Sequence, residues 1–389
     1  MRLFVWKRKA FALLRKKRFV LLIIVAGLIY TFVKKLDEEE FPETCLRFST
    51  DLYTDVTNTF HHFVISPLSL KVVLGLIATG TEGDTYDQIV NLLCLEQEEN
   101  IKENFEKIST VLLEENYMKF HGKNKLFVRN DFDINYKHRR EAIDYFKTDI
   151  ESINFYSQYA IKKINKWIKE HSSNIIQNVT MSISGNSSSI LVNVLYYHPK
   201  WNFQSKRKLK KPFNLGTGQY FEFDVIAGNI KAFYSESTRL QAKFLKLPSK
   251  DDDITMFIAL PNNINGMSRL EANVQEVFTT EPDEFAEIYV EIPQFSLETL
   301  IDYRSILQNM GIHDIFEDGA NSDKMHVRRN NGIKINGVLQ NIFIEINEPE
   351  VSFDSKPGSA EKQFVVDRPF MFYVKFMKEV LFVGRFFPS

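Results

Sequence analysis

The residues that commonly carry catalysis are spaced in ways that do not assemble an active site. His61 and His62 are adjacent, so in an extended strand their side chains point to opposite faces and cannot ligate one metal ion. No other histidine or cysteine group has metal-ligand spacing, and the chain has neither a Gly-rich phosphate-binding loop nor a G-x-S-x-G nucleophile elbow. We therefore predict that the protein is not an enzyme and uses no cofactor or metal.

One short segment has the charge needed to bind an anionic partner. Lys206, Arg207, Lys208, Lys210 and Lys211 form the densest basic run after residue 48. Such a run suits an anionic glycan or an anionic membrane surface. A solvated loop or strand end explains the same residues, and both interpretations stay open at this point.

Charge is distributed unevenly along the chain. Residues 1–35 contain ten Lys or Arg and no acidic residue, which leaves 39 of the 49 basic residues against 50 acidic ones, a net charge of −11. A domain of that charge is poorly suited to wrapping nucleic acid. We expect no nucleic-acid partner.

The N-terminal segment reads as a targeting signal. Phe19–Val33 is an uncharged run of fifteen residues, about 22 Å long as a helix, and Arg18 and Lys34 flank it. Two interpretations remain: a secretory signal cleaved before Gly27, or an uncleaved signal anchor that leaves the N-terminus in the cytoplasm. The long basic flank favours the anchor, and both interpretations place the domain in the secretory pathway, outside the cell or on its surface.

Two further features depend on that route. Asn178 and Asn186 each begin an N-x-S/T sequence, the acceptor for N-glycosylation, although such short matches also arise by chance. The two cysteines, Cys45 and Cys94, can pair as a single disulfide or remain buried thiols. Glycosylation and chance both remain possible explanations for the two asparagines, and a disulfide and two thiols both remain possible for the two cysteines.

Hydrophobic periodicity predicts helices in the first half of the chain and mainly strands in the second. The predicted helices are Phe48–Thr59, a helix opened by Ser66 and Pro67, His138–Phe146 and Ala160–His171; the predicted strands are Asn124–Val128, Ile190–Tyr197, Phe221–Val225, Gln241–Leu247, Thr255–Leu260 and Ile288–Ile292. This order, without regular alternation, favours an α+β fold with largely antiparallel sheets. We predict one domain over residues 48–389, after a linker at 36–47 and the basic segment 1–35.

Several segments together resemble the serpins. They are Val64–Leu70, Gly80–Thr85, Leu191–Tyr197 with Lys200 and Trp201, Glu291–Phe295, Met310–Phe316, Asn347 with Glu348, Asp367–Phe370 and Leu381–Phe386. They follow the family's order from about Phe48 to Ser389. The resemblance implies the serpin fold: three mostly antiparallel β-sheets, about nine helices and an exposed reactive loop. It also implies a serine protease as partner, and we expect a monomer.

The resemblance places the reactive loop between Glu348 and Pro369. In inhibitory serpins a protease cuts this loop, forms an acyl-enzyme, and is carried along as the loop inserts into the central sheet. An inserted strand needs small, uncharged side chains, and proline cannot donate to a central ladder. The loop residues that depart from this requirement are Pro349, Val351, Phe353, Asp354, Lys356 and Pro357.

The loop is also several residues shorter than is usual in the family, which reduces the strand available for insertion. Gly358 and Ser359 fall near the bond that the family's proteases cut, judged by distance to Pro369. Lys356 and Lys362 are the residues beside which a trypsin-like protease would cut.

The region that opens to admit the loop is altered as well. Ser66 and Asn193 match the family, whereas His62 stands where the family usually has Asn and Gln340 where it usually has His. We hypothesise that His62 and Gln340 exchange donor and acceptor roles across one contact. Simple divergence of a sheet that no longer opens is the alternative.

These departures favour a non-inhibitory serpin of the secretory pathway, acting in binding, as a carrier, or as a substrate of proteases. The alternative is a functional serine-type endopeptidase inhibitor with an atypical loop.

Overall fold

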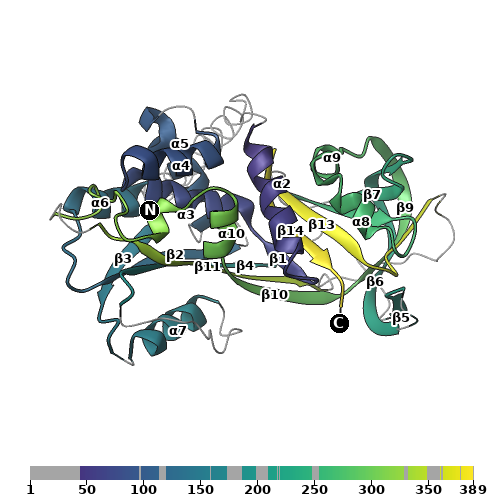
Figure 1. Cartoon of the computed structure of the whole chain (residues 1–389). Coiled ribbons are helices and arrows are strands. Elements are labelled where there is room, and N and C mark those ends of the chain that lie inside the picture. Colours follow the sequence, from purple (N-terminus) through teal and green to yellow (C-terminus); the bar gives the residue numbers. More distant parts are fainter. Residues whose placement is uncertain are drawn as a thin grey trace, which may run out of the picture. The chain divides into compact units, whose positions relative to one another are not determined.

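The computed structural model describes most of the chain from residue 44 onward (Figure 1). The described ranges are 44–95, 98–113, 120–157, 159–172, 186–198, 209–216, 218, 220–247, 254–327, 332–347, 360, 362–376 and 378–388. Several predicted features lie outside them: Phe19–Val33, Asn178, Lys206–Lys208 and the loop residues Glu348–Ser359. Across the described ranges, no helix is long and apolar enough to span a membrane.

The described residues form nine α-helices, most of them before the strand-rich second half. They are α2 Thr44–Thr57, α3 Pro67–Thr79, α4 Gly83–Leu93, α5 Glu98–Leu113, α6 Tyr136–Asp144, α7 Tyr159–His171, α8 Met267–Glu271, α9 Val274–Thr279 and α10 Arg304–Asn309, with a 3-10 turn at Asp314–Phe316. The fourteen strands are β1 Phe63–Ile65, β2 Phe120–Arg129, β3 Thr148–Ile153, β4 Ser189–Tyr197, β5 Leu209–Asn214, β6 Tyr220–Ser237, β7 Ala242–Leu247, β8 Ile254–Pro261, β9 Glu284–Pro293, β10 Phe295–Asp302, β11 Ile335–Ile346, β12 Lys362–Val365, β13 Phe370–Phe376 and β14 Glu379–Phe386.

The strands confirm an α+β fold with mostly antiparallel pairing. One sheet has the order β10-β11-β4-β2-β3, and its β11/β4 and β2/β3 pairs are parallel. The other follows β1-β14-β13-β8-β7-β6-β9-β12, with β5 beside β6. The described strands thus form two hydrogen-bonded sheets where three were predicted, because the 18-residue strand β6 pairs with β5, β9 and β7 and joins them into one.

The five-stranded sheet is covered on both faces (Figure 1). On one face, Ile164 and Ile168 of α7 pack against Val192 and Val194 of β4. On the other, α3 lies close enough for its Ser69 to bond to β4. Helix α3 is buried over nearly its whole length. This is expected, because apolar residues lie on all sides of the helix. The sheet therefore presents almost no free face to solvent at its centre.

A cluster of phenylalanines fills the space where the two sheets meet. Phe295 of β10 lies 4.4 Å from Phe386 of β14 between ring centroids, and Phe370 and Phe213 contact Phe386 at 5.2 and 5.4 Å. Aromatic rings fill large volumes and prefer the tilted arrangements seen here. The abundance of Phe in the sequence is therefore used to pack one sheet against the other.

Candidate functional site between strands β4 and β11

The start of α3 anchors the first part of the candidate site. Ser66 caps the helix, because its Oγ accepts a hydrogen bond from Ser69 N at 3.3 Å, and Pro67 occupies the first turn. The same hydroxyl donates to Leu381 O of β14 at 2.7 Å. Ser66 is fully buried, so the predicted helix start is confirmed and also ties α3 to the second sheet.

Gln340 of β11 holds this helix start against the sheet. Its Oε1 accepts from Ser66 N and from the Tyr303 hydroxyl, both at 3.0 Å. Its Nε2 donates to Ser66 O at 3.1 Å and to Asn193 Oδ1 at 2.9 Å. Burial raises the pKa of Tyr303 well above its ordinary value, which keeps the phenol neutral and able to donate. Within the described residues, all four hydrogen-bonding positions of the Gln340 amide are used.

Asn193 carries the contacts across to the next strand. Its Nδ2 donates to Ser69 Oγ at 2.8 Å and to Asn124 Oδ1 of β2 at 2.6 Å. Asn193 is fully buried and lies directly opposite Gln340 in the parallel register of β4 and β11. The predicted grouping of Ser66, Asn193 and Gln340 is therefore one buried polar network.

His62 is not part of this network, and the hypothesis that it exchanges roles with Gln340 is wrong. Its Nδ1 accepts from Phe387 N at 3.1 Å, and its ring lies 5.2 Å from that of Phe386. Burial lowers the pKa of His62. The reason is distance along the chain, because the three residues of β1 lie between His62 and Ser66 and place them four extended positions, about 13 Å, apart.

The carboxyl ends of β4 and β11 are joined by a second set of contacts. The rings of Tyr196 and Phe343 stack 5.6 Å apart and nearly parallel, at 8°. The Tyr196 hydroxyl donates to Glu345 Oε2 at 3.2 Å, and His198 Nδ1 lies 3.6 Å from the same oxygen. Burial and the adjacent Glu345 carboxylate raise the pKa of Tyr196. We call β4 and β11 with these two sets of contacts the seam.

The seam is closed along its length. Residues from Ile335 opposite Ser189 to Ile344 opposite Tyr197 are paired, with one irregularity between Ile335 and Gly337. A strand inserted between β4 and β11 must break this ladder, the bond between Gln340 and Asn193, and the stack of Tyr196 on Phe343. These contacts therefore oppose the separation of β4 from β11.

The remaining described candidates lie elsewhere. Lys211 is in β5, where its Nζ pairs with the buried Glu291 carboxylate at 2.9 Å, so part of the basic run is already neutralised. Asn186 is exposed, whereas Ser188 of the same sequence is 7% exposed. Cys94 ends α4 in the left-handed conformation, but the Cys45 side chain is outside the described structure, so their pairing stays a prediction.

Several seam residues were not predicted from the sequence. Ser69 is a polar residue within the apolar helix α3, a pattern that signals a buried hydrogen-bonded group, whereas Asn124 stands between Lys123 and Lys125 and carries no such signal. Tyr196 and Phe343 read as ordinary apolar strand residues, and only the parallel register brings them together. Tyr303 carries no signal in the sequence for its contact with Gln340.

Comparisons with known proteins agree over nearly the whole described chain. A family model for "Serpin (serine protease inhibitor)" matches residues 43–388. Alaserpin of Manduca sexta is 24% identical over 358 residues, which cover 87% of this chain and 91% of alaserpin. The leukocyte elastase inhibitor of Xenopus tropicalis is 26% identical over 377 residues, covering 90% and 99% of the two chains.

Solved structures match in the same way. A highly specific serpin of the insect Tenebrio molitor superposes with a TM-score of 0.81 at 26% identity, covering 90% of this chain and 98% of that one. Uncleaved ovalbumin superposes with a TM-score of 0.80, covering 89% and 99% of the two chains. At 20% identity, the likeness to ovalbumin shows a shared fold alone.

Proposed function

This chain belongs to the serpin family, and from that premise we propose that it does not trap proteases. We propose that it acts as a binding or carrier protein, or as a substrate whose loop a protease cuts and leaves. The observation that carries the proposal is the composition of the segment between Glu348 and Pro369. Two prolines, three charged residues (Glu350, Asp354 and Lys356) and a large aromatic side chain occupy the part that would insert.

Each of these residues opposes insertion for its own reason. Pro349 and Pro357 have no N–H to donate to a central ladder. Asp354 and Lys356 would place two charges on a strand at the centre of the sheet. Phe353 needs interior volume, and the interior behind the seam is already filled: Leu195, Ile342 and Ile344 are at most 1% exposed.

The closed seam supports the same proposal. Opening it breaks the hydrogen bonds of Gln340 and Asn193, whose partners lie in different elements, and each of these groups that stays buried without a new partner costs about 1–3 kcal/mol. A loop that inserts must replace these contacts with a new ladder and new packing. The loop residues of this chain are poorly equipped to supply either.

The relatives favour the alternative, a serine-type endopeptidase inhibitor. Two of the similar proteins carry names that describe inhibition, the leukocyte elastase inhibitor of Xenopus tropicalis and antichymotrypsin-2 of Bombyx mori. In that case the protease partner would be trapped after cutting near Gly358 and Ser359, or beside Lys356 or Lys362.

The two functions are separated by incubating the protein with a panel of serine proteases of trypsin-, chymotrypsin- and elastase-like specificity. A relative that traps one of these proteases serves as the positive control. We expect cleavage within residues 348–369, mapped by mass spectrometry, and no complex that survives SDS. A covalent complex at stoichiometric yield would establish the inhibitor instead.

We further propose that the domain enters the secretory pathway, on the evidence of Phe19–Val33 and its basic flanks. N-terminal sequencing of protein from secreting cells distinguishes the two forms, since a chain that starts near Gly27 is cleaved and one that retains Arg18 is anchored. A mass loss on glycosidase treatment that is smaller in Asn186→Gln than in the unaltered chain tests glycosylation at that exposed site. A chain recovered only from cytosol would exclude this route.

A further inference from the structure

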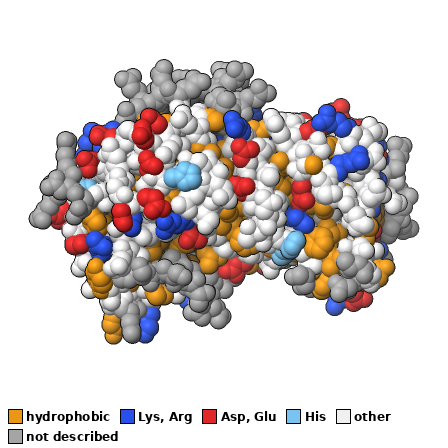
Figure 2. Space-filling model, in the orientation of Figure 1, with side chains coloured by type: hydrophobic (Ala, Val, Ile, Leu, Met, Phe, Trp, Pro, Cys, Tyr) orange, Lys and Arg blue, Asp and Glu red, His pale blue; other side chains and the backbone are white. Residues whose placement is uncertain are grey.

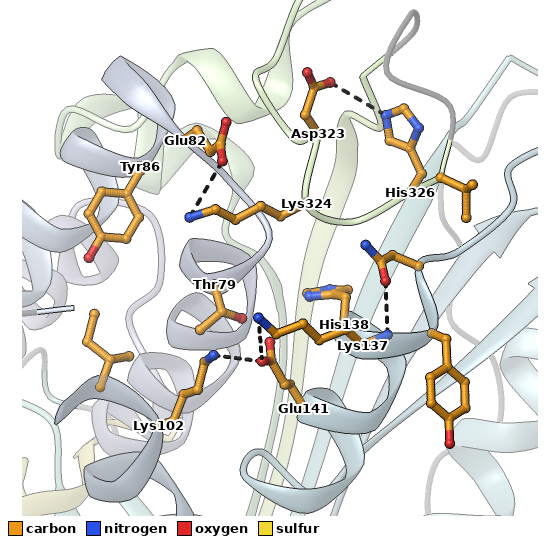
Figure 3. Close-up of a pocket in the computed structure, with 14 residues that line it drawn as sticks. Thr79, Glu82, Tyr86, Lys102, Lys137, His138, Glu141, Asp323, Lys324 and His326 are labelled. Atoms are coloured by element: carbon orange, nitrogen blue, oxygen red, sulfur yellow. Dashed lines mark hydrogen bonds and ion pairs between the residues drawn. The ribbon is translucent and has the colours of Figure 1, made fainter. Parts of the chain in front are cut away.

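A cavity of about 560 Å³ lies among helices α3 to α6, and none of the seam residues lines it (Figure 3). Its walls come from the end of α3, from α4, α5 and α6, and from the segment 323–327. The volume falls within the range of small-molecule sites, about 300–1,000 Å³. Four separate helices therefore enclose a space that the packing of the fold leaves open.

Two buried histidines of this cavity have ring nitrogens without hydrogen-bond partners among the described residues. His138 of α6 is 2% exposed, and neither its Nδ1 nor its Nε2 has a partner. His326 is 3% exposed and its Nε2 is also unpartnered, with the nearest carboxylate, that of Asp323, 3.9 Å away. Buried polar atoms in native proteins are almost always satisfied, so three such nitrogens in one cavity point to a missing partner.

Two of the cavity's carboxylates, Glu141 and Glu82, already face lysines, and the third, Asp323, faces His326. Among the described residues, by contrast, His138 faces no charged partner within hydrogen-bond distance. Glu141 accepts from Lys102 Nζ at 2.7 Å, and Lys137 Nζ lies 4.0 Å from the same oxygen. Glu82 lies 3.7 Å from Lys324 Nζ (Figure 3). Lys137 has 80% of its side chain exposed, and an ammonium has three donors, so this residue can turn to another acceptor.

The protonation state of His138 fits a neutral donor. Burial lowers the pKa of His138 to about 4, with Glu141 acting to raise it and Lys102 to lower it. At neutral pH the ring therefore carries one N–H to donate and one nitrogen to accept. The neutral His138 ring can therefore donate a hydrogen bond to an anion without first binding a proton.

The mouth of the cavity adds apolar surface. Tyr136 and Val327 are 71% and 64% exposed, which is high for residues of their type, and Ile101 and Tyr86 also line the walls. A ligand with a ring or hydrocarbon body would cover these side chains while its polar group reached the histidines. Such a division between apolar walls and a few convergent polar groups is typical of small-molecule sites.

We propose that this cavity binds a small organic anion, whose phosphate or carboxylate oxygens accept hydrogen bonds from His138 and Lys137 and whose ring or apolar body packs against Tyr136 and Ile101. A metal ion is disfavoured, because the described residues contain no group of three His, Cys, Asp or Glu side chains placed to hold one. The proposal is independent of the loop and of the seam.

Isothermal titration calorimetry on the full chain tests the proposal with four probes: phenyl phosphate, benzoate, inorganic phosphate and benzyl alcohol. We expect saturable binding of phenyl phosphate or benzoate, and weaker binding of inorganic phosphate, which lacks the ring, and of benzyl alcohol, which lacks the charge. Comparison of the first two probes tells which anionic group the cavity prefers.

The variant His138→Phe keeps the ring's bulk and removes both nitrogens. Since a hydrogen bond to a charged group contributes about 1.5–3 kcal/mol, we expect binding about tenfold weaker or more. His313→Phe, at an exposed histidine that does not line the cavity, should bind like the wild type. If His138→Phe fails to fold, as judged by its thermal midpoint, Lys137→Ala at the exposed rim serves instead and should weaken binding of the three anionic probes but not of benzyl alcohol. The proposal is overturned if the wild type shows no saturable binding, if His138→Phe or Lys137→Ala binds phenyl phosphate and benzoate as tightly as the wild type, or if benzyl alcohol binds as tightly as those two probes.

Discussion

Gln340 shows how a single side chain can hold a sheet shut. Its amide has two donors and two acceptor positions, and all are used by Ser66, Tyr303 and Asn193. A planar amide with two donors and two acceptors bonds in four directions, whereas a neutral imidazole offers one donor and one acceptor. The sequence predicted the grouping of Ser66, Asn193 and Gln340. It could not predict that His62 lies apart, because that depends on the path of β1.

Removing the Gln340 amide tests its role. We expect Gln340→Ala to lower the free energy of unfolding by about 2–4 kcal/mol, since it leaves Ser66 N, Asn193 Oδ1 and the Tyr303 hydroxyl without their partner. Denaturant melts give the value. The matched control is Gln363→Ala, an exposed glutamine on β12, which should change stability by less than about 0.5 kcal/mol. Equal effects of the two substitutions would contradict the assigned role.

His138 predicts a specific acid sensitivity. Its pKa is about 4 in the folded protein and about 6.5 in the unfolded chain, so between these values only the unfolded chain binds the proton. Its contribution to stability is therefore complete above pH 6.5 and is lost as the pH falls toward 4, by about 1.4 kcal/mol per pH unit. In His138→Phe the free energy of unfolding should fall less between pH 7 and pH 4.5. Parallel pH profiles for the two proteins would refute this.

At the scale of elements, local signals in the sequence predicted where a helix or strand begins better than how far it extends. Helix α3 begins where Ser66 and Pro67 indicated, because the cap and the first turn are set by adjacent residues. Strand β6 was predicted only over Phe221–Val225, yet it extends to Ser237 through Gly228 and Asn229, residues of low strand propensity. Its pairing with β9 across residues 225–234 overrides that propensity. Tertiary pairing of this kind cannot be read from one strand alone.

The stack of Tyr196 on Phe343 should govern local opening of β11. Phe343→Leu keeps the apolar bulk and removes the ring contact, which contributes about 0.5–1.5 kcal/mol. Hydrogen–deuterium exchange at amides of residues 342–346 should become about fivefold faster, because opening there costs about 1 kcal/mol less. Phe285→Leu, at a 60% exposed ring of β9, is the control and should leave these amides unchanged. Unaltered exchange in Phe343→Leu would show that the ladder alone holds the seam.

At the scale of the whole molecule, the closed seam and the loop composition are two parts of one question. A serpin that inserts its loop reaches a more stable state by adding a strand to the central sheet. This chain has the five-stranded sheet with β4 and β11 in direct contact, so the space for that strand exists only if the seam opens. Whether opening lowers the free energy of the protein depends on the loop, and the predictions made for the loop from its sequence stay predictions.

Restoring the loop should therefore restore the stability gain on cleavage. In the unaltered chain we expect a cut within residues 348–369 to leave the thermal midpoint nearly unchanged. The fivefold variant Pro349→Thr, Phe353→Ala, Asp354→Ala, Lys356→Ala and Pro357→Ala replaces both prolines, the large ring and two of the charges, and its cleaved form should melt at a higher temperature. In a domain of this size about 5 kcal/mol of added stability raises the midpoint by roughly 10 °C. The uncleaved variant controls for effects of the substitutions themselves, since it should melt like the uncleaved parent. A comparable rise of the thermal midpoint on cleavage of the unaltered chain would mean that its loop inserts despite its prolines and charges. That result would contradict the proposed non-inhibitory function.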